Sequence, residues 1–330
     1  MSGRQNGGPD AVGSARRPAL VCATGSTFDG LPLAYSRQPA PDLDPWVQSL
    51  AVADILDREP SRRCGIFASS PSIRVLLNGR WRFHTADGVK EVDATEHSRI
   101  CYFGAQTKLM EVEVEGPIRF FLLKFRPGAP PLDRTKTHAD ALDRIEIFDH
   151  GLPPHIGRGE YAHEDAREKW LDHFEYVTRE ILFSTVDEEP PQIARVVDHR
   201  VLRESDLDLD LLAKEFGVSR RTVERHVKQC FGLNPKRVVR RARALDMAAV
   251  LLNVAKPEDD DLYRLRYFDQ SHLTREVQAH FTLAPGALAK QEAVLLRIDL
   301  EIRQLRRLEV MNGGAGTTPP WRDPAAEPRA

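Results

Sequence analysis

The hydrophobic pattern changes its period once along the chain, and this change limits the fold to two unlike parts. Between about residues 63 and 127, apolar residues alternate with polar ones, as in half-buried strands. The alternating runs are Ile73, Val75 and Leu77, then Met110, Val112 and Val114, then Ile118, Phe120 and Leu122. From Glu164 onward, apolar residues recur at three- and four-residue steps, which is typical of amphipathic helices.

The two patterns predict an α+β fold, with a small antiparallel β-barrel or sandwich followed by an all-α part. The expected segments are a flexible tail (1–40), a β-rich domain (41–150), a helical connection (151–189), a helical domain (190–290), a carboxy-terminal helix extension (291–310) and a disordered tail (311–330). Within the β-rich domain, Trp46 to Leu56 is predicted as a short helix. The two tails are predicted from their Gly and Pro content, because they offer little apolar surface to bury.

Composition excludes several classes of protein. Hydrophobic residues make up 41% of the 330 residues, which allows a core in each of two domains. No stretch approaches the roughly 20 apolar residues of a membrane-spanning helix, and the amino end lacks a signal-peptide core. We therefore expect a soluble, cytoplasmic protein with no membrane partner. The four cysteines form no CxxC pair, which predicts free thiols rather than a structural zinc site.

The segment from Leu207 to Arg243 carries an informative local pattern. Apolar residues at 209, 212, 213 and 216 form one face of a short helix, and Gly217-Val218 supplies a tight turn. Ser219 is a favourable N-cap for a second helix that runs to about Cys230. Two short helices joined by a glycine turn, with the second helix basic, predict a helix-turn-helix unit that places one helix in the major groove of DNA.

Positive charge is concentrated in the same segment. From Ser219 to Arg243 there are nine Lys and Arg residues and one acid, Glu224, which gives a net charge of +8. Because the whole chain has a formal charge of −2, the remainder carries −10. A solvated helical face rich in arginine is the alternative interpretation. The charge coincides with a capped helix after a glycine turn, and this favours phosphate binding.

Residues 190–290 resemble the DNA-binding domain of the AraC family of bacterial transcription regulators. The first matching motif runs from Leu212-Ala213 to Phe231-Gly232-Leu233-Asn234-Pro235, and the second is Asp269-Gln270-Ser271-His272 followed by Thr274-Arg275. The resemblance implies two helix-turn-helix units joined by a long helix, here Lys236 to Asn253. It also implies sequence-specific binding to double-stranded DNA and regulation of transcription.

The residues expected to contact DNA fall into three groups. The first recognition helix reaches base edges and adjacent backbone through Arg220, Arg221, Thr222, Arg225, His226 and Lys228. The start of the linking helix contacts phosphate through Lys236, Arg237, Arg240 and Arg241. The second recognition helix, by the resemblance, presents Gln270, Ser271, His272 and Arg275 to DNA.

The second unit departs from the family pattern. Arg266 stands where glycine is usual, and Thr282 and Ala284 stand where glycine and threonine are usual. Asp259, Asp260 and Asp261 add negative charge just before it. We therefore expect the first unit to carry most of the DNA affinity.

The β-rich domain weakly resembles the cupin-like sensor domains that precede AraC-type DNA-binding domains. The resemblance implies either binding of a small-molecule effector, whose identity stays open, or dimerisation. A metal-dependent cupin enzyme fused to the DNA-binding domain is an alternative. It would need clustered ligands, and His84 and His97 are the only histidines of the sheet region. No nucleotide loop or nucleophile motif is present, so we predict no enzyme, no metal and no cofactor.

The last helix allows a third interpretation, in which the helix-turn-helix domain serves protein interaction. From about Pro285 to Val310, apolar residues fall on heptad positions, namely Leu288, Leu295, Ile298, Ile302 and Leu305. This pattern is shorter than the three to four heptads that indicate a coiled coil. The favoured expectation is a helix folded back on its own domain, and the alternative is a contact within a homodimer.

Overall fold

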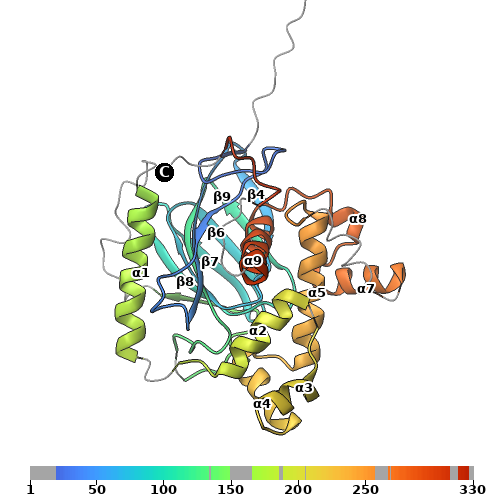
Figure 1. Cartoon of the computed structure of the whole chain (residues 1–330). Coiled ribbons are helices and arrows are strands. Elements are labelled where there is room, and N and C mark those ends of the chain that lie inside the picture. Colours follow the sequence, from blue (N-terminus) through green and yellow to red (C-terminus); the bar gives the residue numbers. More distant parts are fainter. Residues whose placement is uncertain are drawn as a thin grey trace, which may run out of the picture.

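The computed structural model describes residues 20–133, 135–148, 166–185, 189–204, 206–256, 267, 269–312 and 319–326. Among them, antiparallel sheets form the amino-terminal part and helices the carboxy-terminal part (Figure 1). The predicted α+β class is confirmed. No helix in the described ranges is long and apolar enough to cross a membrane.

Two antiparallel sheets build the β domain. The larger sheet has the order β1 (Leu20–Cys22), β3 (Val47–Asp57), β10 (Ile118–Phe125), β5 (Ser72–Leu76), β8 (Arg99–Phe103) and β11 (Ile145–Phe148), with β2 (Tyr35–Arg37) also paired to β3. The smaller sheet has the order β4 (Ser61–Ile66), β9 (Met110–Glu115), β6 (Arg80–Thr85) and β7 (Gly88–Asp93). The predicted turns at Asn78-Gly79 and Asp87-Gly88 lie beside β6, and both glycines adopt positive φ (81° and 116°).

Strand β3 corrects the prediction of a helix over Trp46 to Leu56. The strand lies between β1 and β10 and is buried on both faces over most of its length. Ala51, Ala53 and Ile55 face one core, and Leu50 and Val52 face the other. A strand buried on both faces reads as a nearly continuous apolar run, which periodicity cannot distinguish from a buried helix.

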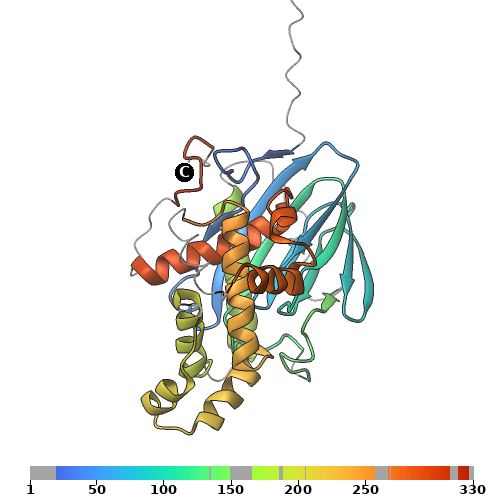
Figure 2. The ribbon, with the colours of Figure 1, turned by 90° about the vertical axis from the view of Figure 1, so that its right-hand side faces the viewer.

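Helices cover both sides of the larger sheet. Helix α1 (Ala166–Thr185) packs through Leu171 and Phe174 on the face that carries Leu123. Helix α9 (Val294–Asn312) lies on the opposite side, where its apolar residues join the core of the two sheets (Figure 1). Figure 2 shows α9 crossing α5 (Pro235–Leu251), the long helix of the carboxy-terminal part.

The last helix therefore packs differently from expectation. It does not fold back only on the helical domain, because Val294, Leu295, Ile298 and Ile302 are buried among residues of both sheets. Leu296, Leu300 and Leu308 pack instead with α5 and α7 (Gln270–Phe281). One helix thus serves two cores, and its heptad spacing reflects burial within its own chain.

Both predicted tails are partly ordered. In the amino-terminal segment, Leu33 and Ala34 are fully buried, and β1 and β2 pair with β3. In the carboxy-terminal segment, Trp321 and Arg322 are buried, and the backbone of Arg322 forms an isolated antiparallel β-bridge with Thr27. The prediction of a flexible tail over 1–40 and of a disordered tail over 311–330 is therefore wrong for residues 20–40 and 319–326. Composition gave the wrong expectation because these segments are stabilised by distant parts of the chain.

Truncation of a core residue of α9 should destabilise the β domain. Ile302→Ala is expected to lower the free energy of unfolding by about 2–5 kcal/mol, because it leaves a cavity among residues of both sheets. Met311→Ala on the same helix is the control, since Met311 is half exposed. Urea unfolding of both variants measures the effect. An equal, small change in both would show that α9 does not belong to the core.

Candidate nucleic-acid interface

The first helix-turn-helix unit forms as its local sequence predicts. Helix α3 (Leu209–Glu215) is capped by Asp208, whose carboxylate accepts from the backbone N–H groups of residues 210 and 211 at 3.0 and 2.9 Å. Gly217 supplies the turn with φ of 62°. Helix α4 (Arg220–Phe231) begins after Ser219, whose hydroxyl accepts from Thr222 N–H at 3.2 Å. Side chains of α2 (Gln192–Glu204), α3 and α4 share one apolar cluster.

After α4 ends at Phe231, a three-residue connection leads to α5. Asn234 caps α5 by accepting from Arg237 N–H at 3.0 Å, and Pro235 occupies its first turn. A surface groove runs along α4 to the start of α5, and its lining includes Ser219, Arg221, Thr222, Arg225, Asn234 and Lys236. Two helix N-termini direct backbone N–H groups and partial positive charge to this region, an arrangement suited to phosphate.

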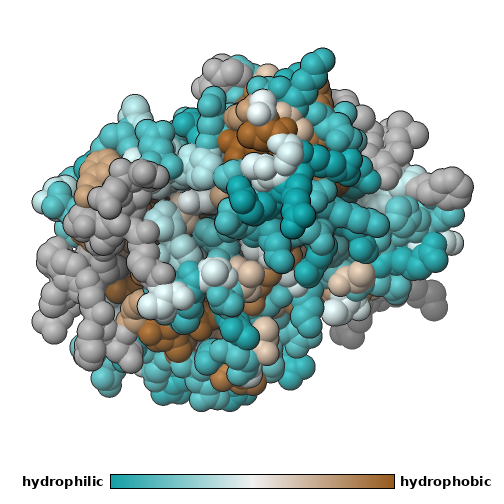
Figure 3. Space-filling view, turned by 90° about the horizontal axis from the view of Figure 1, so that it is seen from below, coloured by the Kyte–Doolittle hydropathy of each residue, from teal (hydrophilic) through white to brown (hydrophobic). Residues whose placement is uncertain are grey.

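The exposed cations of this unit differ in their availability. Arg221, Arg225, Lys228, Lys236 and Arg237 are exposed and form no ion pair with any residue in the described ranges. Arg220 is exposed but pairs with Asp210 at 2.8 Å and with Glu224 at 3.3 Å. Thr222 and His226 are half-buried. Seen from below, the side of the molecule where α3 and α4 lie is mostly hydrophilic, with a few hydrophobic areas (Figure 3).

Two predicted phosphate contacts are occupied by other partners. Arg241 is 2% exposed, and its Nη1 donates to the backbone oxygen of Gln106 in the β domain at 3.0 Å. Burial lowers the pKa of Arg241. The prediction that Arg241 contacts DNA is wrong, because α5 turns this position towards the β domain. Arg240 stays partly exposed and pairs through two bonds, of 3.0 and 2.8 Å, with Glu276 of α7.

The second unit exposes fewer of its predicted DNA-contacting side chains than the first unit. Asp269 caps α7 by accepting from His272 N–H at 2.7 Å. Gln270, Ser271 and Arg275 are exposed, whereas His272 is half-buried and lies 3.8 Å from Glu276. The positions predicted to weaken this unit at 259–261 and at Arg266 lie outside the described residues. Thr282 adopts φ of 61°, the left-handed conformation that a glycine would provide more readily.

Backbone contacts that the sequence did not reveal tie both units to the β domain. In the second unit, Leu109 N–H donates to His280 O at 2.7 Å, and the His280 ring lies 2.9 Å from Thr107 O. In the first unit, Gly128 N–H donates to Cys230 O at 3.2 Å. Gly232 has φ of 69°, and a Cβ there would come within 2.9 Å of the His138 backbone. Such contacts leave no trace in local sequence patterns.

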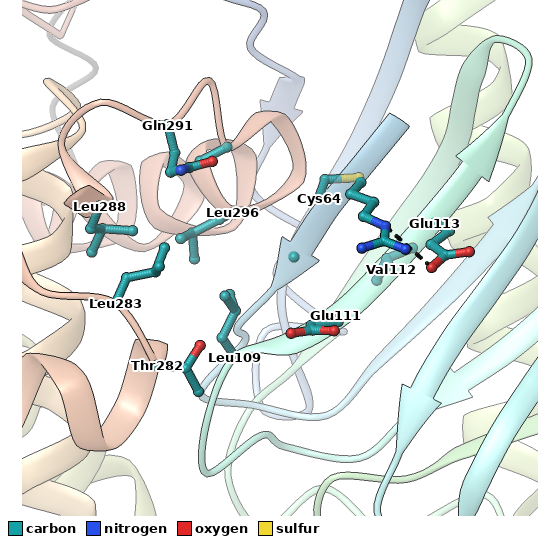
Figure 4. Close-up of a pocket in the computed structure, with 13 residues that line it drawn as sticks. Cys64, Leu109, Glu111, Val112, Glu113, Thr282, Leu283, Leu288, Gln291 and Leu296 are labelled. Carbon is teal, nitrogen blue, oxygen red and sulfur yellow. Dashed lines mark ion pairs between the residues drawn. The ribbon is translucent and has the colours of Figure 1, made fainter. Parts of the chain in front are cut away.

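A separate hollow lies where the β domain meets the second unit (Figure 4). Its volume is about 250 Å³. Leu109 and Val112 line it from the sheet side, and Leu283, Leu288 and Leu296 line it from the helical side. Its charged groups include Glu113, which pairs with Arg63 at 3.4 Å. The mainly apolar lining distinguishes this hollow from the basic groove of α4 and α5.

The alternative interpretation, a metal-dependent cupin enzyme, requires a cluster of metal-binding side chains. Within the described ranges, no group of three or more His, Cys, Asp or Glu side chains is placed to hold a metal ion. His84 lies on the exposed side of β6, 3.7 Å from Glu113, and His97 lies in the turn before β8. All four cysteines are free thiols, as predicted.

Comparison with known families agrees with the geometry of α3, α4, α5 and α7. Residues 212–291 match the family described as helix-turn-helix domain. This part of the chain is a helix-turn-helix domain of the AraC type. The resemblance stated from the two sequence motifs is thereby confirmed.

Solved structures show only a general likeness. An apo form of ToxT from Vibrio cholerae has a TM-score of 0.45 and 9% identity, covering 77% of this chain and 98% of that one. ToxT with a bound unsaturated fatty acid has a TM-score of 0.42 and 10% identity, covering 73% and 94%. The carboxy-terminal domain of AraT, a response regulator from Geobacillus stearothermophilus, has a TM-score of 0.26 and 21% identity, covering 30% and 84%. No curated protein matches the sequence significantly.

The buried and exposed arginines of α5 should behave oppositely. Arg237→Ala is expected to weaken DNA binding about equally on all sequences and to lower the slope of log affinity against log salt by about 1, because one phosphate contact is lost. Arg241→Ala should lower the free energy of unfolding by about 1–3 kcal/mol and leave that slope unchanged. Salt titrations and urea unfolding of both variants separate the roles. A reduced slope for Arg241→Ala would restore it as a DNA contact.

Proposed function

We propose that the protein regulates transcription by sequence-specific binding to double-stranded DNA, mainly through α4. The observation that carries the proposal is the set of exposed basic side chains on α4 and early α5, free of ion pairs in the described ranges and next to two capped helix N-termini. A helix of this kind enters the major groove with its N-terminal residues towards the bases. Within this proposal, the protein acts in the cytoplasm.

Within this proposal, the residues divide between positioning and base reading. Lys236 and Arg237 at the start of α5 contact phosphate and orient the domain. Arg221 and Arg225 on α4 are the candidates for bidentate pairing with guanine, because arginine presents two parallel donors to its O6 and N7 atoms. Gln270, Ser271 and Arg275 of α7 give the second unit a smaller set of exposed donors. Enzymatic activity forms no part of the proposal.

Two features of regulators in this class remain proposals for this protein. A homodimer would bind two half-sites about one helical turn apart. A small-molecule effector would act through the β domain, whose loops hold both helix-turn-helix units by hydrogen bonds. Selection of bound sequences from a random DNA pool, followed by salt titration on the selected site, tests the function. Enrichment of one motif supports it, two spaced copies support the dimer, and no enrichment contradicts sequence-specific binding.

Loss of one recognition arginine should alter specificity at one position. Arg225→Ala is expected to weaken binding to the selected site by about 1–3 kcal/mol and to relax the preference at a single base pair. Gln229→Ala, at an exposed and uncharged position of the same helix, is the control for helix integrity. Binding assays on single-base variants of the site measure the effect. Unchanged affinity and preference would refute the assignment of α4 as the recognition helix.

The second unit should contribute less than the first. Two triple alanine variants are compared, one at the exposed residues Gln270, Ser271 and Arg275 of α7 and one at Arg221, Arg225 and Lys228 of α4. The α7 variant is expected to cost less affinity. The reason is that Glu276 of α7 already pairs with Arg240, so less unpaired positive charge faces the DNA there. The two triple variants are compared on the same selected site, with unfolding measured for each. A larger loss from the α7 variant would show that the second unit dominates.

A further inference from the structure

One end of the inner face of the larger sheet is polar and basic. Lys124 of β10 is paired in register with Ser72 of β5 and with Ser49 of β3, so all three side chains lie on the same face. Arg74 follows Ser72 by two residues and shares that face. None of the four is more than 9% exposed. Two buried cations at the centre of a sheet would be costly without an anionic partner.

Helix α9 supplies that partner. Asp299 is 1% exposed, and both of its carboxylate oxygens accept from Nη2 of Arg74, at 2.8 and 3.0 Å. Nζ of Lys124 lies 3.4 Å from the backbone oxygen of Asp299. The Arg74 guanidinium also lies 5.1 and 5.3 Å from the ring centres of Phe103 and Phe120, which fix its orientation. The carboxylate of Asp299 therefore lies in a buried cationic site beside two aromatic rings.

The site has more donors than this one carboxylate uses. Nε and Nη1 of Arg74 and the hydroxyls of Ser49 and Ser72 are buried and have no hydrogen-bond partner among the described residues. Burial lowers the pKa of Lys124 to about 8, against the opposing effect of Asp299. Arg303, the next cation along α9, is engaged elsewhere by Asp246 at 3.1 Å. A single structural ion pair would need only the donors that Asp299 already uses. The additional donors around Arg74 are typical of a site that binds an anion.

We propose that the inner face of the β domain is a carboxylate-binding site and that Asp299 of α9 occupies it as an intramolecular ligand. The apolar neighbours of Asp299 on α9, Leu295 and Ile302, fill the rest of the interior, where a diffusible effector would otherwise lie. The ligand class is a carboxylate that accepts from Arg74 with both oxygens. The site itself does not depend on the proposed DNA binding.

The occupant of the site is also bonded to the DNA-binding domain. Arg303 of α9 donates to Asp246 of α5, and Arg297 donates to the backbone oxygen of Leu252 at the end of α5, at 3.3 Å. Occupation of the carboxylate site thereby fixes the position of the helix that joins the two helix-turn-helix units. An effector that acted inside the β domain would have to displace α9, and this is how the site bears on the proposed regulation.

Removal of the internal ligand and replacement by a free carboxylate tests the proposal. Asp299→Ala in the full chain should be less stable than the wild type, and sodium acetate should raise its midpoint of thermal unfolding by at least about 2 °C over sodium chloride of equal ionic strength. The wild type, whose site is filled, should show no such difference between the salts. An equal response of both proteins would overturn the proposal, because it would indicate a general salt effect.

The double variant R74M/D299A is the matched control, since it lacks both the ligand and its main receptor. It should lose the acetate response, and retention of the response would place acetate elsewhere and contradict the proposal. If Asp299→Ala does not fold in either salt, the isosteric D299N decides. Adding R74M should then destabilise D299N much less than it destabilises the wild type, because the unbalanced cation is removed. Equal destabilisation in both backgrounds would show that the two side chains are not coupled.

Discussion

The contact between Arg74 and Asp299 joins β5 of the β domain to α9. The two residues are 225 positions apart, yet both are almost completely buried and share two short hydrogen bonds. A buried ion pair of this kind adds little stability over an apolar pair of equal size, but breaking it leaves an uncompensated charge. Its main effect is to fix where α9 lies, because only one register of the helix brings Asp299 to Arg74.

With α9 fixed, the arrangement of the helical domain follows. Helix α9 packs on α5 and α7 with one side and on both sheets with the other. The loops of the β domain then bind both helix-turn-helix units through backbone hydrogen bonds at Gln106, Thr107, Leu109 and Gly128. Helices α4 and α7, the proposed recognition helices, are therefore both positioned by contacts to the same domain, in addition to the long helix between them.

Local structure was predictable wherever the residues that determine it lie within the same short segment of sequence. Ser219, Asn234 and Asp269 cap their helices as their side chains favour, and Gly217 provides the turn between α3 and α4. The recognition surface of α4 could be named because exposed basic residues and inward apolar residues separate on a single helix. The alternation of apolar and acidic residues in β9 likewise predicted a strand, since only one of its faces meets the core.

The failures share a different cause, which is contact with distant parts of the chain. Arg241 appeared to belong to the basic surface of α5, yet the oxygen that accepts its hydrogen bond belongs to Gln106, 135 residues away. Strand β3 lacked alternation because α9 and α1 bury its two faces. Trp321 is buried near Glu301, although Gly and Pro surround it in the sequence. No local pattern contains the partner in any of these cases.

The place of α9 in the core also sets an order of events during synthesis. The strands of the β domain leave the ribosome long before α9, but their shared interior includes four of its apolar residues and the partner of Arg74. The β domain cannot complete its interior until α9 has been translated. The first helix-turn-helix unit emerges before that point with a core of its own, whereas the core around α7 also needs residues of α9. Docking of α5 and α7 onto the β domain is therefore completed only by α9, and a chain interrupted before this helix would lack the partner of Arg74.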